Sequence, residues 1–430
     1  MLLTFFRTLV ASAAVFVASP AALSQSLDQI IDRYESFDRA GDPEKSAKAN
    51  SEDARSWQVV SPSYIRDRAR SASQMLAALD ALGYTTEGPE VPILRHLLNA
   101  HIDAHAYDTA RIPFTGDWGF FAAPAFAAMR TRLTTRSQTE AWIDRLNDLP
   151  RYFDQQTENM RRGIATGWTQ HGDPLNTSIA QIRAQIVEDP ADSTLFLPFE
   201  SLSASDLSES DILLLQARGR TAVGEAIDAY RDLLTFMEME YAPAARVAPG
   251  LSSMQGGREA YAVAVAFHTA GAGYSPEEIH QLGQSEVARI RADMDAIIEE
   301  LAFEGTFEAF ITFLRNDPQF YAETPEQLLE KASEMSKRLD ALLPRYFKTL
   351  PRLPYGVEAV PAAIAPGYTT GRYSGGDAEK GIAGTYLVNT YALDQRPLYE
   401  LPALSAHEAV PGHHLQIALA QELQDVPDFR

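Results

Sequence analysis

The chain has 430 residues, of which 45% are hydrophobic, so it can bury a substantial core as one large domain or two ordinary ones. Its 58 acidic residues against 37 basic ones give a formal net charge of -21, which argues against nucleic acid or an anionic membrane surface as a partner. The absence of cysteine excludes disulfides, cysteine nucleophiles and thiolate zinc sites. Histidine, aspartate and glutamate are the metal ligands that remain.

The amino terminus is typical of an export signal. A basic residue precedes the largely apolar stretch Thr8 to Val17, and the small residues Ala22-Leu23-Ser24 suit cleavage before Gln25. An uncleaved membrane anchor is the alternative, but Ser19-Pro20 interrupts the stretch and its apolar part is short for a bilayer span. We therefore expect a signal peptide at 1–24 and a periplasmic or secreted protein. Without cysteine, a lipoprotein anchor is excluded.

The next predicted elements are helices. After a polar loop at 40–56, apolar residues at helical spacing predict helices near 62–83 and 90–106. A capping box, Ser137-Gln138-Thr139-Glu140, then begins a helix. One face of that helix carries Trp142, Leu146, Leu149 and Phe153. A further helix is predicted near 206–241.

The second half adds three helices and a small sheet. Ser275 and Thr324 are each followed by Pro and an acidic residue, which is a helix start signal. Residues 351–399 are rich in Pro, Gly and Tyr, with β-favouring runs at Val357–Val360 and Thr385–Thr390, and a last helix is predicted near 402–424. We therefore expect a mainly α fold with a small β-sheet, in one domain over 25–430.

The segment that carries chemistry is Ser405-Ala406-His407-Glu408-Ala409-Val410-Pro411-Gly412-His413-His414-Leu415-Gln416. It places three of the nine histidines within eight residues, with a glutamate directly after the first. A catalytic zinc is held by neutral imidazoles, beside a carboxylate that can take a proton from water. Surface histidines in a turn between helices are the alternative interpretation, but packing does not require this concentration of ligand types. We predict zinc as the cofactor and Glu408 as the general base.

The histidine spacing requires a distorted helix. The familiar His-Glu-x-x-His motif places two imidazoles on one face, four residues apart. His407 and His413 are six apart, on different faces, and His414 lies about 10.5 Å further along the axis than His407. Pro411 cannot donate to the carbonyl of His407, and Gly412 tolerates unusual backbone angles. A bulge there would return His413 to the usual ligand position, so we favour His407 and His413 as ligands, with His414 as the alternative.

The segment from His407 to Gln416 resembles the signature of a bacterial family, the domain of unknown function 885. The likeness extends through Gly384–Thr390 and Tyr274–Gly283 and, less specifically, Met160–Ile164. The resemblance implies a zincin-like fold of the gluzincin type, related to oligopeptidases and helical carboxypeptidases and usually exported. It brings no settled substrate.

The resemblance also implies a third zinc ligand beyond this chain. Members of the family continue into a helix with a Glu-Gly-Trp-Ala-Leu-Tyr-like motif, whose Glu is the expected ligand. The last tryptophan here is Trp168, so we expect that ligand beyond Arg430 and expect the 430-residue chain alone to be inactive. Glu422 is a poor substitute, because it lies on the predicted helix of His414 about two turns further on.

Several further residues are candidates for the site. Residues Tyr386 to Thr390 are predicted as a strand, which is either an edge strand that pairs with an extended peptide or an ordinary buried strand. A Tyr or Arg near zinc can stabilise a developing negative charge. The candidates for that catalytic role are Tyr373 and Arg372, and those for substrate contact are Tyr386, Asn389 and Tyr391.

His101 and His105 also have the spacing of a ligand pair, but no glutamate follows His101, so a structural or solvent-facing pair is favoured. Taken together, the sequence predicts an exported zinc-dependent hydrolase of a peptide or small amide. One alternative is a metal-dependent hydrolase of an ester or non-peptide amide that uses the same residues. The other is a secreted helical binding protein without catalysis.

Overall fold

The computed structural model of the chain describes residues 26–43, 52, 54–83, 88–115, 119–205, 207–362, 365–378, 381–424 and 426–430. The predicted signal peptide at 1–24 and residues 44–51 and 53 of the predicted polar loop lie outside these residues. The chain divides into two compact units, Met1–Glu278 with Pro427–Arg430, and Ile279–Val426. We expected one domain, but the contacts of the chain separate it at the start of a long helix, Pro276–Glu300, that buries none of its residues.

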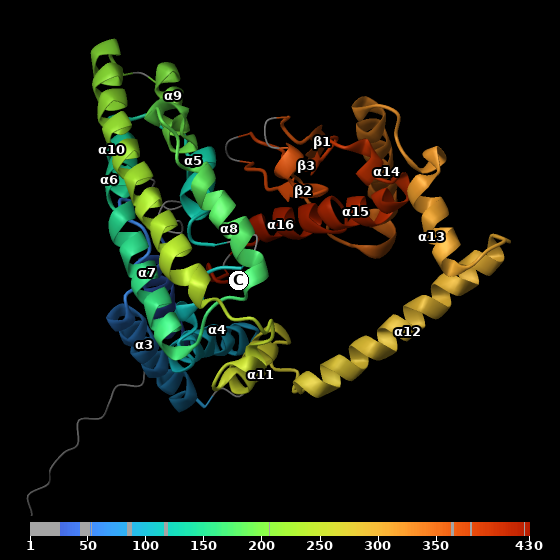
Figure 1. Cartoon of the computed structure of the whole chain (residues 1–430), viewed down its shortest axis with the longest axis horizontal. Coiled ribbons are helices and arrows are strands. Elements are labelled where there is room, and N and C mark those ends of the chain that lie inside the picture. The colour runs from blue at the N-terminus through green and yellow to red at the C-terminus, as the bar shows by residue number, and fades with distance from the viewer. Residues whose placement is uncertain are drawn as a thin grey trace, which may run out of the picture. The chain divides into compact units, whose positions relative to one another are not determined.

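The first unit is built from helices (Figure 1). These helices are α1 (Leu27–Gly41), α3 (Pro62–Ala81), α4 (Glu90–Ala106), α5 (Ala123–Arg130), α6 (Arg136–Asn147), α7 (Leu149–Thr166), α8 (Gly172–Ala184), α9 (Leu197–Glu200), α10 (Glu209–Phe236) and α11 (Gly257–His268). A π-helical turn, Met237–Tyr241, continues α10. The helices predicted near 62–83, 90–106 and 206–241 are confirmed by α3, α4 and α10.

The main core of this unit lies where α10 packs against α6 and α7. Tyr230 of α10 is fully buried, and its hydroxyl donates to the carbonyl of Phe121 over 2.7 Å. A second core joins α1, α3 and α4, and the ring of Phe429 packs edge-on against Tyr34 of α1. The last residues of the chain are therefore part of the first unit.

One predicted helix start lies two residues too late. The helix α6 begins at Arg136, because Thr135 is its cap and Gln138 completes the capping box, in place of the predicted Ser137 and Glu140. The helix also ends at Asn147, so the apolar face that we predicted on one helix comes from α6 and α7 together. Its four large side chains are nevertheless all buried.

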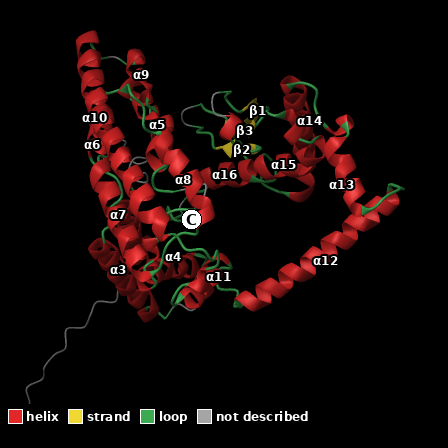
Figure 2. Ribbon diagram, in the orientation of Figure 1, coloured by secondary structure: helices red, strands yellow, loops and turns green. Residues whose placement is uncertain are grey.

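The second unit contains helices α12 (Pro276–Glu300), α13 (Phe307–Asn316), α14 (Pro325–Tyr346), α15 (Leu401–Glu408) and α16 (His413–Gln421). Its strands are β1 (Tyr355–Ala359), β2 (Gly371–Ser374) and β3 (Gly384–Val388). The predicted helix starts are confirmed, because Ser275 accepts from the N–H of Glu278 and Thr324 accepts from that of Gln327. Figure 2 shows that helices dominate the chain and that its strands form a small sheet, as expected.

The sheet has the order β1-β3-β2. The strand β1 is parallel to β3, and β2 is antiparallel to it, with Tyr373 opposite Tyr386. The two β-favouring runs were therefore predicted correctly, whereas β2 was missed. The suggestion that residues Tyr386 to Thr390 form an edge strand was wrong, because β3 is the middle strand and its side chains Tyr386 and Val388 are buried.

The helices α14 and α15 pack beside this sheet. Leu328 and Ala332 of α14 share a core with Tyr386 of β3 and Leu401 of α15. This core fixes the start of α15, and so the position of the histidine segment, against the sheet. Across the described residues, no helix is both long enough and apolar enough to span a membrane.

Candidate metal centre

The predicted helix near 402–424 is broken at the histidine motif. The helix α15 ends at Glu408 and α16 begins at His413. Between them, Ala409 has φ −95° and ψ −100°, the peptide bond between Val410 and Pro411 is cis, and Gly412 has φ −75° and ψ −129°. The predicted distortion at Pro411 and Gly412 is thus confirmed.

Glycine is required at position 412 because the chain folds back on itself. A Cβ there would lie 1.9 Å from the carbonyl oxygen of His407 and 2.5 Å from that of Ala406, both of them main-chain atoms that cannot turn aside. The N–H of His414 donates over 3.0 Å to the carbonyl of Ala409, five residues back. The segment therefore advances less along the helix axis than a continuous helix would.

As a result, the structure brings His407, Glu408 and His413 together. One ligand atom from each lies within 4.8 Å of the others, and this is the group of possible metal ligands found among the described residues. The two imidazole rings have centroids 4.7 Å apart and are nearly perpendicular, at 86°. His407 is exposed and Glu408 is buried, so the group has one open side and one closed side. Two imidazoles suit zinc, and a carboxylate beside them can take a proton from water.

A hydrogen bond from the sheet holds the carboxylate of Glu408 in place. The main-chain N–H of Tyr373 in β2 donates to its Oε2 atom over 2.8 Å, and only 8% of Glu408 is exposed. His413 Nε2 lies 3.9 Å from the same oxygen. The phenol of Tyr386 is close by, and burial, with a smaller contribution from the charge of Glu408, raises its pKa to about 12. That phenol is therefore neutral at ordinary pH.

His414 lies apart from this group. Its ring is buried at 2% exposure, and its Nδ1 atom is 2.9 Å from the hydroxyl of Tyr373. Burial, the largest cause, lowers the pKa of His414. Of the two histidines that the sequence left open, His413 is the one that approaches His407. The assignment of ligands stays a prediction.

The remaining candidates for catalysis or substrate contact differ in how exposed they are. The hydroxyl of Tyr373 forms a hydrogen bond with His414. Arg372 is exposed, and its guanidinium lies over the ring of Tyr368. Tyr391 is 52% exposed and can face solvent or a ligand. Tyr386 and Asn389 are fully buried, which does not support the prediction that they contact substrate.

Sequence reasoning missed two residues beside His414. The ring of Tyr355 lies 4.5 Å from the ring of His414, and the hydroxyl of Tyr355 donates to Asp340 over 3.0 Å. Both residues lie far from the motif in sequence, on β1 and α14. Only the tyrosine-rich composition of the 351–399 stretch pointed toward the first of them.

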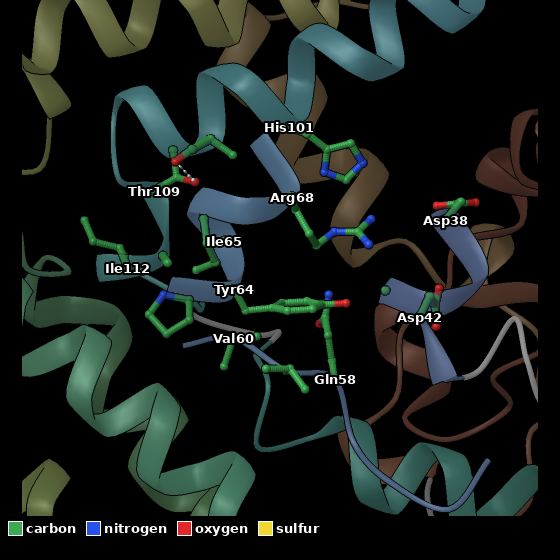
Figure 3. A pocket seen from close by; sticks show the side chains of 15 residues that line it. Asp38, Asp42, Gln58, Val60, Tyr64, Ile65, Arg68, His101, Thr109 and Ile112 are labelled. Atoms are coloured by element: carbon green, nitrogen blue, oxygen red, sulfur yellow. Dashed lines mark hydrogen bonds between the residues drawn. The ribbon is translucent and has the colours of Figure 1, made fainter. Parts of the chain in front are cut away.

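A separate cavity of about 530 Å³ lies in the first unit (Figure 3). Arg68 of α3 and His101 of α4 lie on one wall, and the guanidinium of Arg68 is 3.6 Å from the centroid of the Phe37 ring. His101 also packs edge-on against Phe37, at 4.9 Å between ring centroids. His101 makes this ring contact and His105 is exposed, and the interpretation of the pair as structural or solvent-facing stays a prediction.

Comparisons with known proteins give a family and a fold. Residues 39–430 match the model of a family described as "Bacterial protein of unknown function (DUF885)". A solved structure, titled "The crystal structure of the putative lipoprotein from Colwellia psychrerythraea", is 20% identical in sequence with a TM-score of 0.75. The match covers 91% of this chain and 72% of that one. No curated protein matches the chain. At this identity the structural likeness concerns the fold alone.

Proposed function

The chain belongs to the bacterial family DUF885, and from the site that it carries we propose that the protein is an exported zinc-dependent hydrolase with a peptide as its favoured substrate. The family description assigns no activity. The proposal therefore depends on the chemistry of the residues at the break between α15 and α16.

The observation that carries the proposal is the convergence of His407, Glu408 and His413 within 4.8 Å. The segment that brings them together needs a glycine at 412 and departs from helical geometry, which packing alone does not demand. Neutral imidazoles suit zinc, and a chain without cysteine has no thiolate to offer instead. We assign the two histidines as ligands. The family resemblance implies a glutamate as the third ligand.

Zinc held at this site would supply Lewis acidity, lowering the pKa of a water molecule and polarising the scissile carbonyl. Glu408 would accept the proton that this water loses and pass it to the leaving amine. The Oε2 atom of Glu408 already accepts from Tyr373, so we assign the proton to Oε1. A carboxylate that is 8% exposed has little competing water, which favours direct transfer.

A peptide is the favoured substrate because the family resemblance relates the chain to oligopeptidases and helical carboxypeptidases. The strand β2 lies at the edge of the sheet, but the side of β2 that faces away from β3 packs against α15, where Glu408 accepts from the N–H of Tyr373. This edge therefore positions the carboxylate that we assign as the base, and it is not open to pairing with a substrate at Tyr373.

The proposed location is the periplasm or the exterior. Residues 1–24 have the pattern of a signal peptide, and the solved neighbour carries the description of a lipoprotein, itself an exported class. Fractionation of the native host with an antibody, together with N-terminal sequencing, tests this proposal. A mature chain that begins at Gln25 supports it, and an intact amino terminus in the cytoplasm contradicts it.

The zinc site is tested in the gene product expressed to the end of its reading frame. Elemental analysis should find about one zinc per chain, and His407→Ala or His413→Ala should abolish its retention. The matched control is His280→Ala, an exposed histidine on α12 that hydrogen-bonds only locally with Gln284. A wild-type protein without zinc, or a control that loses it equally, would contradict the proposal.

The role of the base is tested with Glu408→Gln in the same protein. Hydrolysis of a mixed library of quenched fluorescent peptides should fall by at least about 10²-fold, while zinc content stays at the wild-type level. If zinc is lost together with activity, Glu408 is a ligand and the assignment is wrong. If the protein cleaves esters but not peptides, the proposed substrate class is wrong, whereas the assignment of the site residues stands.

A further inference from the structure

Tyr373 connects Glu408 with His414 through its two ends. Its main-chain N–H donates to Glu408 Oε2 over 2.8 Å, and its hydroxyl lies 2.9 Å from His414 Nδ1. Tyr373 is 8% exposed, so both hydrogen bonds form away from bulk water, where they orient their partners strongly. The carboxylate and the imidazole are thus joined through one residue of β2.

The phenol of Tyr373 fits into a space that a glycine leaves open. A Cβ at Gly384 would lie 2.1 Å from its hydroxyl oxygen. The glycine at 384 therefore makes room for the hydroxyl. The hydroxyl and His414 Nδ1, 2.9 Å apart, share one hydrogen bond.

His414 is fixed from its other sides. The ring is 2% exposed, and its Nδ1 atom lies 2.9 Å from the hydroxyl of Tyr373. The ring of Tyr355 packs against it, and Tyr355 is itself tied to Asp340 of α14 over 3.0 Å. With its ring buried among these contacts, His414 lies apart from the group formed by His407, Glu408 and His413.

We propose that His414 and Tyr373 are positioning residues for the proposed base, so that this inference rests on the proposed function. His414 holds the phenol of Tyr373, the phenol fixes this point of β2, and the N–H at that point aims the carboxylate of Glu408. Loosening the phenol lets the strand and the carboxylate move, and a displacement of about 1 Å at a reacting group costs on the order of 10²-fold in rate. The two residues thus act on catalysis without touching substrate or metal.

The first test does not require activity. The protein is labelled with ¹⁵N at its 17 tyrosines, and the amide signal of residue 373 is identified by its loss in Tyr373→Phe. Glu408→Gln should shift this signal, because the N–H loses a charged acceptor. His414→Leu should shift it too, although the changed side chain lies at the other end of Tyr373. The control His280→Ala should leave it in place. A signal unmoved by His414→Leu would overturn the inference, whatever the protein hydrolyses.

The second test separates positioning from ligation. In Tyr373→Phe and His414→Leu, kcat on the peptide library should fall about 10- to 100-fold, with KM within about twofold. Zinc content and the absorption spectrum of the Co²⁺-substituted protein should stay unchanged. The double variant should be no slower than either single one, because both break the same connection.

A conservative variant guards against misfolding. His414→Asn keeps an acceptor near the position of Nδ1 and should recover part of kcat relative to His414→Leu. Loss of zinc in the His414 variants, or additive losses of kcat in the double variant, would overturn the inference and leave the proposed function standing. A wild-type protein with neither zinc nor hydrolysis overturns the proposed function, and the labelled amide then still decides whether the connection exists.

Discussion

Gly412 lies so close to His407 that a Cβ at position 412 would be 1.9 Å from the carbonyl oxygen of His407. This approach brings the second imidazole of the motif back toward the first. The ring centroids of His407 and His413 are 4.7 Å apart as a consequence, although the two residues are six positions apart in sequence. The glycine is therefore as much a part of the candidate site as the ligands are.

Gly412→Ala should disrupt this approach. The main-chain carbonyls of His407 and Ala406 cannot move without opening the break, so we expect a loss of about 3 kcal/mol or more in the free energy of unfolding, together with loss of bound zinc. Urea unfolding and elemental analysis measure the two effects. The control is Gly375→Ala, whose Cβ would meet only Ile417, at an ordinary 3.6 Å. If both variants keep zinc equally, the close approach of Gly412 to His407 is not required for the metal centre.

Asn389→Ala should reduce stability and not substrate affinity. The buried amide of Asn389 donates to three main-chain carbonyls, those of Ala365, Tyr368 and Thr369, over 2.9 to 3.1 Å. The amide has two hydrogens to donate, and each of two carbonyls left without a donor costs about 1 to 3 kcal/mol, so we expect a loss of about 2 to 6 kcal/mol in urea unfolding. The exposed neighbour Tyr391 gives the control, and Tyr391→Phe should change stability by less than about 0.5 kcal/mol. A raised KM at unchanged stability would restore the substrate-contact interpretation.

A matched pair of glycines on α10 should respond in opposite directions. A Cβ at Gly219 would lie 2.4 Å from the fully buried ring of Phe199, so Gly219→Ala should destabilise the first unit by about 1 to 3 kcal/mol. A Cβ at Gly224 would meet only Pro190, at 3.8 Å, so Gly224→Ala should stabilise it by about 0.5 to 1 kcal/mol through its higher helix propensity. Thermal unfolding of both variants checks the prediction, and equal shifts would contradict the packing of α10 on Phe199.

The first unit should lose stability at alkaline pH through Tyr34. Burial, aided by the charge of Asp38 and opposed by that of Arg68, raises the pKa of Tyr34 to about 12. The folded state therefore favours the neutral phenol, and its stabilisation is complete below pH 10 and disappears as the pH rises through about 12. Between these values, urea unfolding should show a decline on the order of 1 to 2 kcal/mol that is absent in Tyr34→Phe. An identical decline in both proteins would assign it to other groups.

Much of the helical structure could be predicted from the sequence because helix signals are local. The start at Thr324 and the break at Pro411 and Gly412 depend on residues within one or two turns. The misplaced start of α6 shows the limit of such signals, because Thr135 and Ser137 offer similar caps and only packing chooses between them. The division into two units was missed for a related reason, since exposure of the whole of α12 is a property of the fold.

The sequence by itself determined the mainly α class, the family and the residue types of the candidate metal centre, because composition and short-range spacing are properties of the chain alone. Only the tertiary structure decided that β3 is the middle strand, that His413 rather than His414 approaches His407, and that Tyr373 supports Glu408. Strand order and the contact between β2 and α15 join residues tens of positions apart. Their geometry follows from packing across the whole unit, which no local pattern encodes.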